Sequence, residues 1–165
     1  MQNPILTLCS LLTVAASIGS AQTVVRVEPS ELQGPRALSE LTEKAAIRDY
    51  LQSWQSLKLA LEQNRSDLLD PAFVGTAKDK LTETVQQQTA LGILTRYQDT
   101  SHDIKIVFYS PEGLSIELAD QVEYDVQVLD HDKVKTTQHV TARYVIILTP
   151  AEVRWRVRVF QAEPK

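Results

Sequence analysis

Asp120 is the residue whose place in the sequence most favours chemistry. It stands between Leu118 and Val122 in a stretch where apolar residues occupy alternate positions, which is typical of a strand with one buried face. Strict alternation turns Asp120 toward the apolar interior, where a carboxylate can act as a general base. The predicted pairing with the next strand sets Tyr144 opposite as a positioning group. Two structural alternatives stay open: a bulge turns the carboxylate to solvent, or the Tyr144 hydroxyl only satisfies it.

A set of aromatic side chains points, by period, toward the same interior. Their functional interpretation is an aromatic-lined ligand pocket. The structural alternative is ordinary core packing, in which the polar tips reach water or backbone groups. The candidates are Tyr50, Trp54, Tyr124, Tyr144 and Trp155.

The predicted outer face of the sheet mixes arginines with two aliphatic residues. Such a composition suits protein–protein contact, and it predicts a protein partner or a weak homodimer. Alternatively, opposite charges on neighbouring strands only solvate the sheet face. The interface candidates are Arg143, Val145, Ile147, Arg154, Arg156 and Arg158.

Charge and histidine content exclude several other functions. The formal net charge of -4 argues against a nucleic-acid partner and against a polybasic membrane-binding surface. The histidines are His102, His131 and His139, and their spacing does not predict converging metal ligands, so we expect no metal and no cofactor.

The first 21 residues have the pattern of a signal peptide. Residues 5–18 are apolar or small and uncharged, and Gly19 and Ala21 provide the small residues required before a cleavage site. The run is too short to span a bilayer, so no stable membrane anchor is expected after cleavage. We therefore expect an exported protein, periplasmic or secreted. A short buried strand or an uncleaved anchor is the alternative.

The remaining chain predicts a linker at residues 22–37 and one domain at residues 38–163. A possible short edge strand covers Val24–Val27. An amphipathic helix is predicted from the Ser39 cap to about Asn64, and Asp70-Pro71 and Thr76 mark further helix starts.

After Ser101 the apolar period changes to two. The pattern predicts strands at 102–109, 114–129, 135–149 and 152–159 in a four-stranded antiparallel meander. Consistent burial on one face pairs Leu118 with Ile146, and Leu148 with Val153. Helices followed by a meander indicate an α+β fold with the helices on one face of the sheet.

This order of elements resembles the NTF2-like superfamily, a cystatin-like α+β cone. The Trp54 helix, the segment 70–81 and the closing strands at 143–145 and 154–157 are similar to the NTF2-like domain at the end of plastid-division proteins. The resemblance covers about residues 38–161. It implies helices in the concavity of a curved antiparallel sheet, and it leaves function open because the superfold hosts isomerases, dehydratases, transport factors and assembly modules.

Two functional hypotheses follow. The first is an exported, non-catalytic binding or assembly module that uses the outer sheet face. The second is a ligand-binding cone or an isomerase- or dehydratase-like enzyme with Asp120 as general base. An accessory domain that only adds stability is a third interpretation.

Overall fold

The computed structural model describes residues 22–30, 32 and 35–164. The predicted leader, residues 1–21, lies outside the described residues. The elements in chain order are β1 (Val24–Val27), α1 (Glu40–Gln63), a 3-10 helix η1 (Ser66–Leu69), α2 (Gly75–Ala90), β2 (Leu94–Tyr109), β3 (Ile116–Asp130), β4 (Lys133–Pro150) and β5 (Trp155–Ala162).

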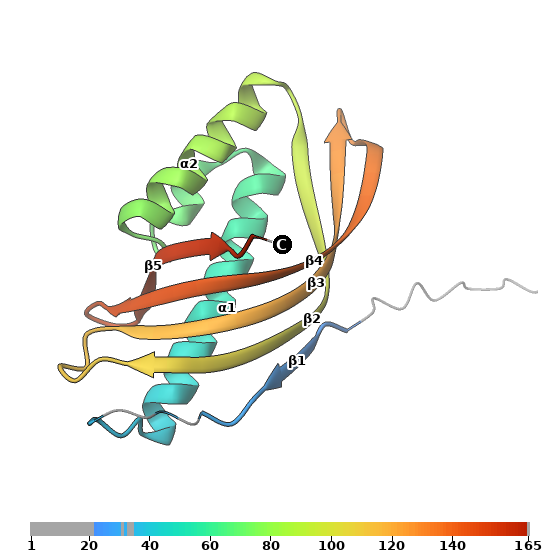
Figure 1. The fold of residues 1–165 in the computed structure, drawn as a ribbon. Helices are drawn as coiled ribbons and strands as arrows, with labels where there is room; N and C mark the ends of the chain where they lie inside the picture. Colours follow the sequence, from blue (N-terminus) through green and yellow to red (C-terminus); the bar gives the residue numbers. More distant parts are fainter. Residues whose placement is uncertain (1–21, 31, 33–34, 165) are drawn as a thin grey trace, which may run out of the picture.

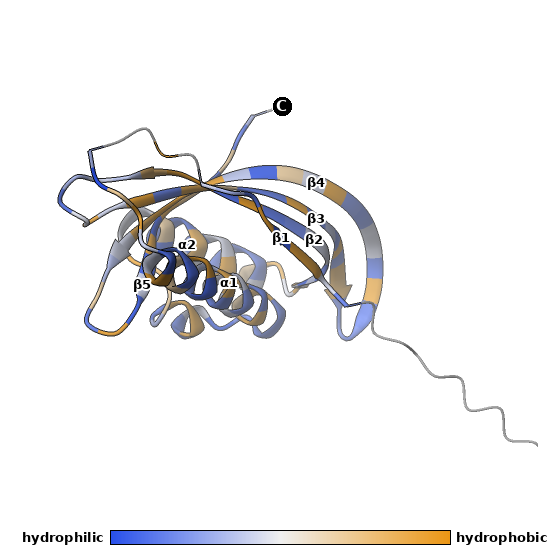
Figure 2. Ribbon diagram, turned by 90° about the horizontal axis from the view of Figure 1, so that it is seen from below, coloured by the Kyte–Doolittle hydropathy of each residue, from blue (hydrophilic) through white to orange (hydrophobic). Residues whose placement is uncertain are grey.

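The strands form one sheet in the order β1-β2-β3-β4-β5. The pairs from β2 to β5 are antiparallel, as predicted, and both α-helices lie on the concave side of the curved sheet (Figures 1 and 2). The α+β class is therefore confirmed. The sheet has five strands rather than four because Val24–Val27 joins its edge, parallel to β2, with Val25 opposite His102. Among the described residues, no helix has the length and apolarity needed to span a bilayer.

Helix α1 begins and ends where the sequence predicts. The Ser39 side chain accepts a hydrogen bond from the Thr42 N–H at 3.2 Å, and Asn64 ends the helix in the left-handed region with a φ of 52°. The apolar stripe of α1 faces the sheet, where Trp54, Leu57 and Leu61 are buried. This packing fixes which α1 side chains reach the interior of the cone.

The predicted register is correct for one hairpin and wrong for the other. On β3 and β4, Leu118 pairs with Ile146 and Asp120 pairs with Tyr144, as expected. On β4 and β5, Leu148 pairs with Val157 instead of Val153. The turn is longer than predicted: Ala151 N–H donates to Arg154 O at 2.8 Å, and Val153 is 84% exposed.

The start of β5 is set by a buried carboxylate on α1. Asp49 is 3% exposed, and its Oδ2 accepts the Trp155 N–H at 2.8 Å. A buried carboxylate needs such donors, so this contact fixes Trp155 as the first residue of the strand. Alternation of apolar residues alone could not reveal it.

Two other predicted boundaries are also wrong. Strand β2 begins at Leu94, eight positions before the predicted start, because Gly92 leaves α2 with a φ of 67° and the Thr95 hydroxyl donates to Gln88 Oε1 at 2.9 Å. Asp70-Pro71 does not start a helix. It follows η1, and the chain then forms an isolated bridge between Phe73 and Val157.

Candidate functional site

Asp120 lies at the centre of a buried polar cluster between α1 and the sheet. It is 0% exposed, as its position on the alternating strand predicts. Its Oδ2 accepts the Tyr50 hydroxyl at 2.7 Å and lies 2.6 Å from His102 Nδ1. Its Oδ1 has no hydrogen-bond partner among the described residues. The three residues come from β3, α1 and β2, so the cluster forms only when the helix docks on the sheet.

The cluster is held rigidly by its neighbours. His102 pairs with Val122 on β3, one position along the same face from Asp120. The Trp54 ring meets the imidazole edge-on, with a centroid distance of 5.1 Å and an interplanar angle of 86°. Packing of this kind limits the ring rotation of His102, so its two nitrogens keep distinct environments.

The hydrogen bonds determine which nitrogen of His102 carries a proton. Burial, followed by the Asp120 charge, raises the pKa of Tyr50 well above its usual value, so the phenol stays protonated and donates. An ionised Asp120 only accepts hydrogen bonds, so its second hydrogen bond comes from an N–H group at His102 Nδ1. In a neutral imidazole this leaves the lone pair on Nε2, for which no partner is present among the described residues.

A groove runs between β1 and α1, and His102 lies on its wall. Its volume is about 770 Å³. Val25 and Val27 form one side, and Ile47 and Leu51 form the other. Charged and amide side chains of α1 also line it, together with Thr23: Glu40, Glu43, Lys44, Arg48, Gln52 and Gln55. The volume lies in the range of small-molecule sites, which are mostly apolar with few polar groups.

Tyr144 does not satisfy Asp120, although the two residues pair as predicted. Its hydroxyl instead lies 2.7 Å from the hydroxyl of Tyr124, and its ring stacks on Phe160 at 4.7 Å. Stacking on Phe160 of β5 holds the Tyr144 ring away from the carboxylate of Asp120. The expected hydrogen bond is therefore wrong, and Tyr50 and His102 replace it.

The predicted aromatic pocket is filled by the aromatics themselves. Tyr50 and Trp54 are each 1% exposed and Tyr124 is 4% exposed, while Trp155 is half-buried against the main core. The Trp54 indole also donates to Asp99 Oδ1 at 3.1 Å. The groove is lined by a different set of side chains, so these residues support the core-packing alternative.

His102, which lies beside the buried Asp120, is the functional candidate that sequence reasoning missed. The signal was present, because His102, Ile104 and Ile106 alternate on one strand and all three are buried. Lys58 was missed as well: its ammonium lies 2.5 Å from Asp99 Oδ2, and that carboxylate is 1% exposed. Among the described residues, no group of three acidic, histidine or cysteine side chains is arranged to hold a metal.

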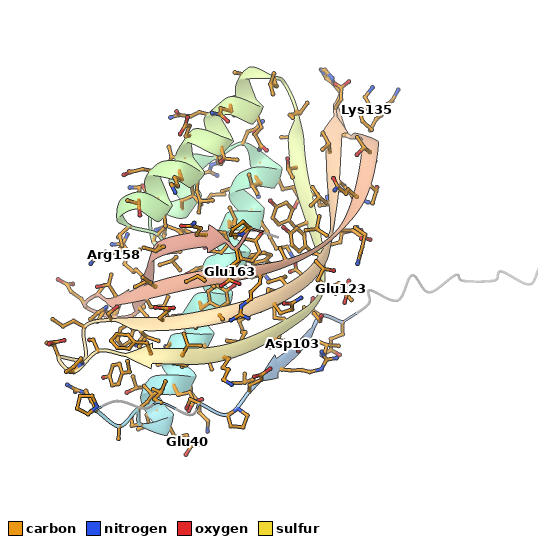
Figure 3. All side chains as sticks on the ribbon, in the orientation of Figure 1. Glu40, Asp103, Glu123, Lys135, Arg158 and Glu163 are labelled. Carbon is orange, nitrogen blue, oxygen red and sulfur yellow. The ribbon has the colours of Figure 1, made fainter. Side chains whose placement is uncertain are left out.

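The outer face of the sheet is less regular than predicted. Arg154 precedes β5, and Arg158 falls at a register shift, so the three arginines do not alternate along one regular strand. The Arg156 guanidinium donates to the backbone carbonyls of Asp70 and Phe73. Arg143 forms an ion pair with Glu163, which Figure 3 labels, with the Nε and Oε2 atoms 3.1 Å apart.

The aliphatic part of that face is present. Val145 and Ile147 are half-buried, and Ile147 pairs with Val159 of β5. Both α-helices lie on the opposite side of the sheet (Figure 2). The outer face therefore carries a small apolar strip that no described helix covers.

Comparisons with known proteins support the fold. No family model matches the chain, and no curated protein matches it. The intermembrane space region of the chloroplast protein ARC6 is similar, at 15% identity and TM-score 0.64, over 79% of this chain and 100% of that one. A putative scytalone dehydratase from Novosphingobium aromaticivorans is similar at 13% identity and TM-score 0.53, over 76% of this chain and 89% of that one.

A further solved structure carries the name of the fold. It is a putative dehydratase of the NTF2-like family from Streptomyces avermitilis, at 9% identity and TM-score 0.51, and the alignment covers 74% of this chain and 98% of that one. Identities this low concern the fold and not the chemistry. The described chain, with its curved sheet closed over α1 and α2, has the NTF2-like fold.

Proposed function

We propose that the chain binds a small, largely apolar molecule in the groove between α1 and β1, and that His102 acts on it as a general base. The observation that carries this proposal is the buried His102–Asp120 pair, 2.6 Å apart, with the imidazole on the wall of the groove. Both residues are buried, Asp120 at 0% and His102 at 1% exposure, but only His102 lines the groove. The role of Asp120 is therefore to orient His102 and to stabilise the imidazolium, while His102 contacts the ligand.

The reaction class that fits this arrangement is removal of a proton from carbon next to a carbonyl group. Isomerisations and dehydrations share that step, and a neutral imidazole held by a carboxylate is suited to it. Tyr50 assists by donating to Asp120, which keeps the carboxylate fixed beneath the imidazole. Two of the structurally similar proteins are described as putative dehydratases, which agrees with the proposal at the level of the fold.

Deuterium exchange tests this proposal without knowledge of the natural substrate. The probes are small cyclic ketones and enones, incubated with the protein in D2O, and proton NMR follows loss of the hydrogen next to the carbonyl. We expect catalysed exchange for at least one probe, and its loss in His102→Gln. His131→Gln is the matched control, because His131 is an exposed histidine in the β3–β4 turn.

Binding is measured separately on the same panel by thermal shift. Probe binding without exchange, equal in the wild type and in His102→Gln, would contradict the role of His102 and leave only a binding groove. Exchange that persists in His102→Gln would place the base elsewhere.

A second function is supported by the uncovered strip on the outer sheet face, which suits a non-catalytic protein-binding or assembly module. Val145, Ile147 and Val159 form that strip, and Arg143 lies beside it. We expect Val145→Lys to abolish cross-linking to a partner in the native host. Thr84→Lys, an exposed position on α2 at the opposite side of the sheet, is the control.

We also infer that either function is exercised outside the cytoplasm. This inference depends on the uncharged apolar run at residues 5–18 and the small residues Gly19 and Ala21. It predicts a mature chain that starts at Gln22.

A further inference from the structure

Strand β4 runs far beyond the strand that pairs with its outer edge. It extends from Lys133 to Pro150, but β5 pairs only with Tyr144–Pro150. Every residue from Lys133 to His139 is exposed. Figure 1 shows β4 continuing past the end of β5 into the β3–β4 hairpin, where Figure 3 labels Lys135. No described residue pairs with this outer edge between Val134 and Ala142.

The molecule covers or shortens the other outer edges of its sheet. Beyond β5, the Val74 N–H donates to Val157 O at 2.9 Å, and the Val157 N–H donates to Ala72 O at 2.9 Å. At the other end, the edge strand β1 has only four residues. Covering and shortening are the usual protections against unwanted strand pairing. The free edge of β4, defined here as residues 134–142, is neither covered nor short and contains no proline or glycine; its register shift against β3 lies at its far end, between Val134 and Thr136.

The hydrogen bond at the end of this edge shows which backbone groups point outward. Arg143 O accepts the Glu163 N–H at 2.8 Å, so the backbone groups of Arg143 face the β5 side. Strand alternation then directs the N–H and C=O groups of Thr141, His139 and Thr137 toward the free side. The even-numbered residues from Thr136 to Ala142 face β3, and the register shift lies beyond them.

We propose that a second copy of this chain pairs antiparallel with the free edge of β4, about a two-fold axis at Gln138. This centre uses the whole free edge, since Val134 then lies opposite Ala142 of the other copy. Thr137 faces His139 as a hydrogen-bonded pair in which both outward-pointing backbones exchange bonds. The result is one continuous sheet across the dimer.

The sequence of the edge suits pairing with itself. Thr136 faces Val140, and Lys135 faces Thr141, so no like charges are opposed along the free edge. Five of the nine edge residues are β-branched, and such residues favour strands: Val134, Thr136, Thr137, Val140 and Thr141. A centre at His139 instead opposes Lys135 to Arg143, which is repulsive.

A charge-swap experiment on full-length protein tests the axis. Gln138 of each copy meets its equivalent in a pair without hydrogen bonds, where the Cα atoms approach to about 4.5 Å. Sedimentation equilibrium should show a dimer for the wild type. Gln138→Asp and Gln138→Lys should each weaken self-association about tenfold or more, because like charges meet at the axis. An equimolar mixture of the two variants should restore dimerisation.

The control for the backbone contact is Thr137→Pro, which removes one outward N–H group, compared with Thr137→Ala, which keeps it. Circular dichroism identifies any variant that fails to fold, and the charge swap does not depend on the proline. A wild type that stays monomeric at high micromolar concentration overturns the proposal. So does a dimer that both Gln138 variants leave intact and that Val145→Lys disrupts, since that dimer uses the outer face.

Discussion

Replacement of Asp120 by alanine tests the buried cluster most directly in terms of stability. The carboxylate is completely buried, and its Oδ2 receives both the Tyr50 hydroxyl and His102 Nδ1. Removing it leaves two buried donors without an acceptor. We expect Asp120→Ala to lower the free energy of unfolding substantially, whereas Asp120→Asn keeps an acceptor of the same shape.

The magnitude follows from the two bonds and the orphaned oxygen. Hydrogen bonds to a charged group contribute about 1.5–3 kcal/mol each, which gives about 3–6 kcal/mol for the pair. Removing Oδ1, a buried atom without a hydrogen-bond partner, offsets about 1–3 kcal/mol of that loss. The expected net loss for Asp120→Ala is therefore about 2–3 kcal/mol, and for Asp120→Asn it is below about 1.5 kcal/mol because weaker bonds to a neutral amide replace a buried charge.

Urea unfolding at neutral pH measures these losses. Asp103→Ala is the matched control: Asp103 lies on the neighbouring strand and pairs with the exposed Arg26 at 2.9 Å, a surface contact that contributes less than about 1 kcal/mol. If Asp120→Ala is as stable as this control, the carboxylate does not hold Tyr50 and His102 together, and the described cluster is wrong.

Three further predictions concern the core, the sheet surface and processing. Trp54→Ala should lower the free energy of unfolding by about 3–5 kcal/mol in urea, and Trp155→Ala by clearly less, since Trp54 is 1% exposed and Trp155 only half-buried; equal losses would contradict the packing. The hydrogen bond that His139 donates to Asp125, together with the negative charges of Asp125 and Glu123, raises the pKa of His139. Its stabilising effect is therefore complete below the unfolded pKa of about 6.5 and is lost as the pH rises through the folded pKa, so His139→Gln should differ from the wild type only on the acid side of urea unfolding measured across pH. Mass spectrometry of protein from its host should find Gln22 at the N-terminus, and an intact Met1 would contradict export.

The elements that the sequence predicts well are those with an uninterrupted period and a clear cap. Ser39, the apolar stripe and Asn64 define α1 completely. Alternation through Leu118, Asp120 and Val122 gives the correct register with β4, because a slip of one residue would turn the whole apolar face to solvent.

The failures arise where a distant polar contact decides the local structure. The start of β5 depends on Asp49 of α1. The start of β2 depends on two hydrogen bonds: the Asn64 side chain at the end of α1 donates to Ile93 O, and the Thr95 hydroxyl donates to Gln88 of α2. Such contacts have no periodic signature in either segment. A two-residue turn at Pro150 agrees with the apolar pattern, and only the hydrogen bond between Trp155 and Asp49 excludes it.

Only part of the site could be predicted from the sequence, for the same reason. Alternation correctly places Asp120 inside, but its partners lie on two other elements. His102 has the alternation of a buried strand residue, yet only the sheet register brings it within 2.6 Å of Asp120. The groove depends on β1, which pairs in parallel with β2 across more than 70 residues of sequence, so its walls could not be foreseen.

The central claim is that His102 presents an unprotonated Nε2 to the groove while its Nδ1–H is held by Asp120. Nitrogen-15 NMR of the histidine side chains measures this directly at a pH where the imidazole of His102 is neutral. The account predicts that His102 is the Nδ1–H tautomer, with the Nε2 resonance shifting when a probe enters the groove, and that His131 shows no such shift. A His102 that carries its proton on Nε2 in the wild type would contradict the account, because it would leave no base facing the ligand.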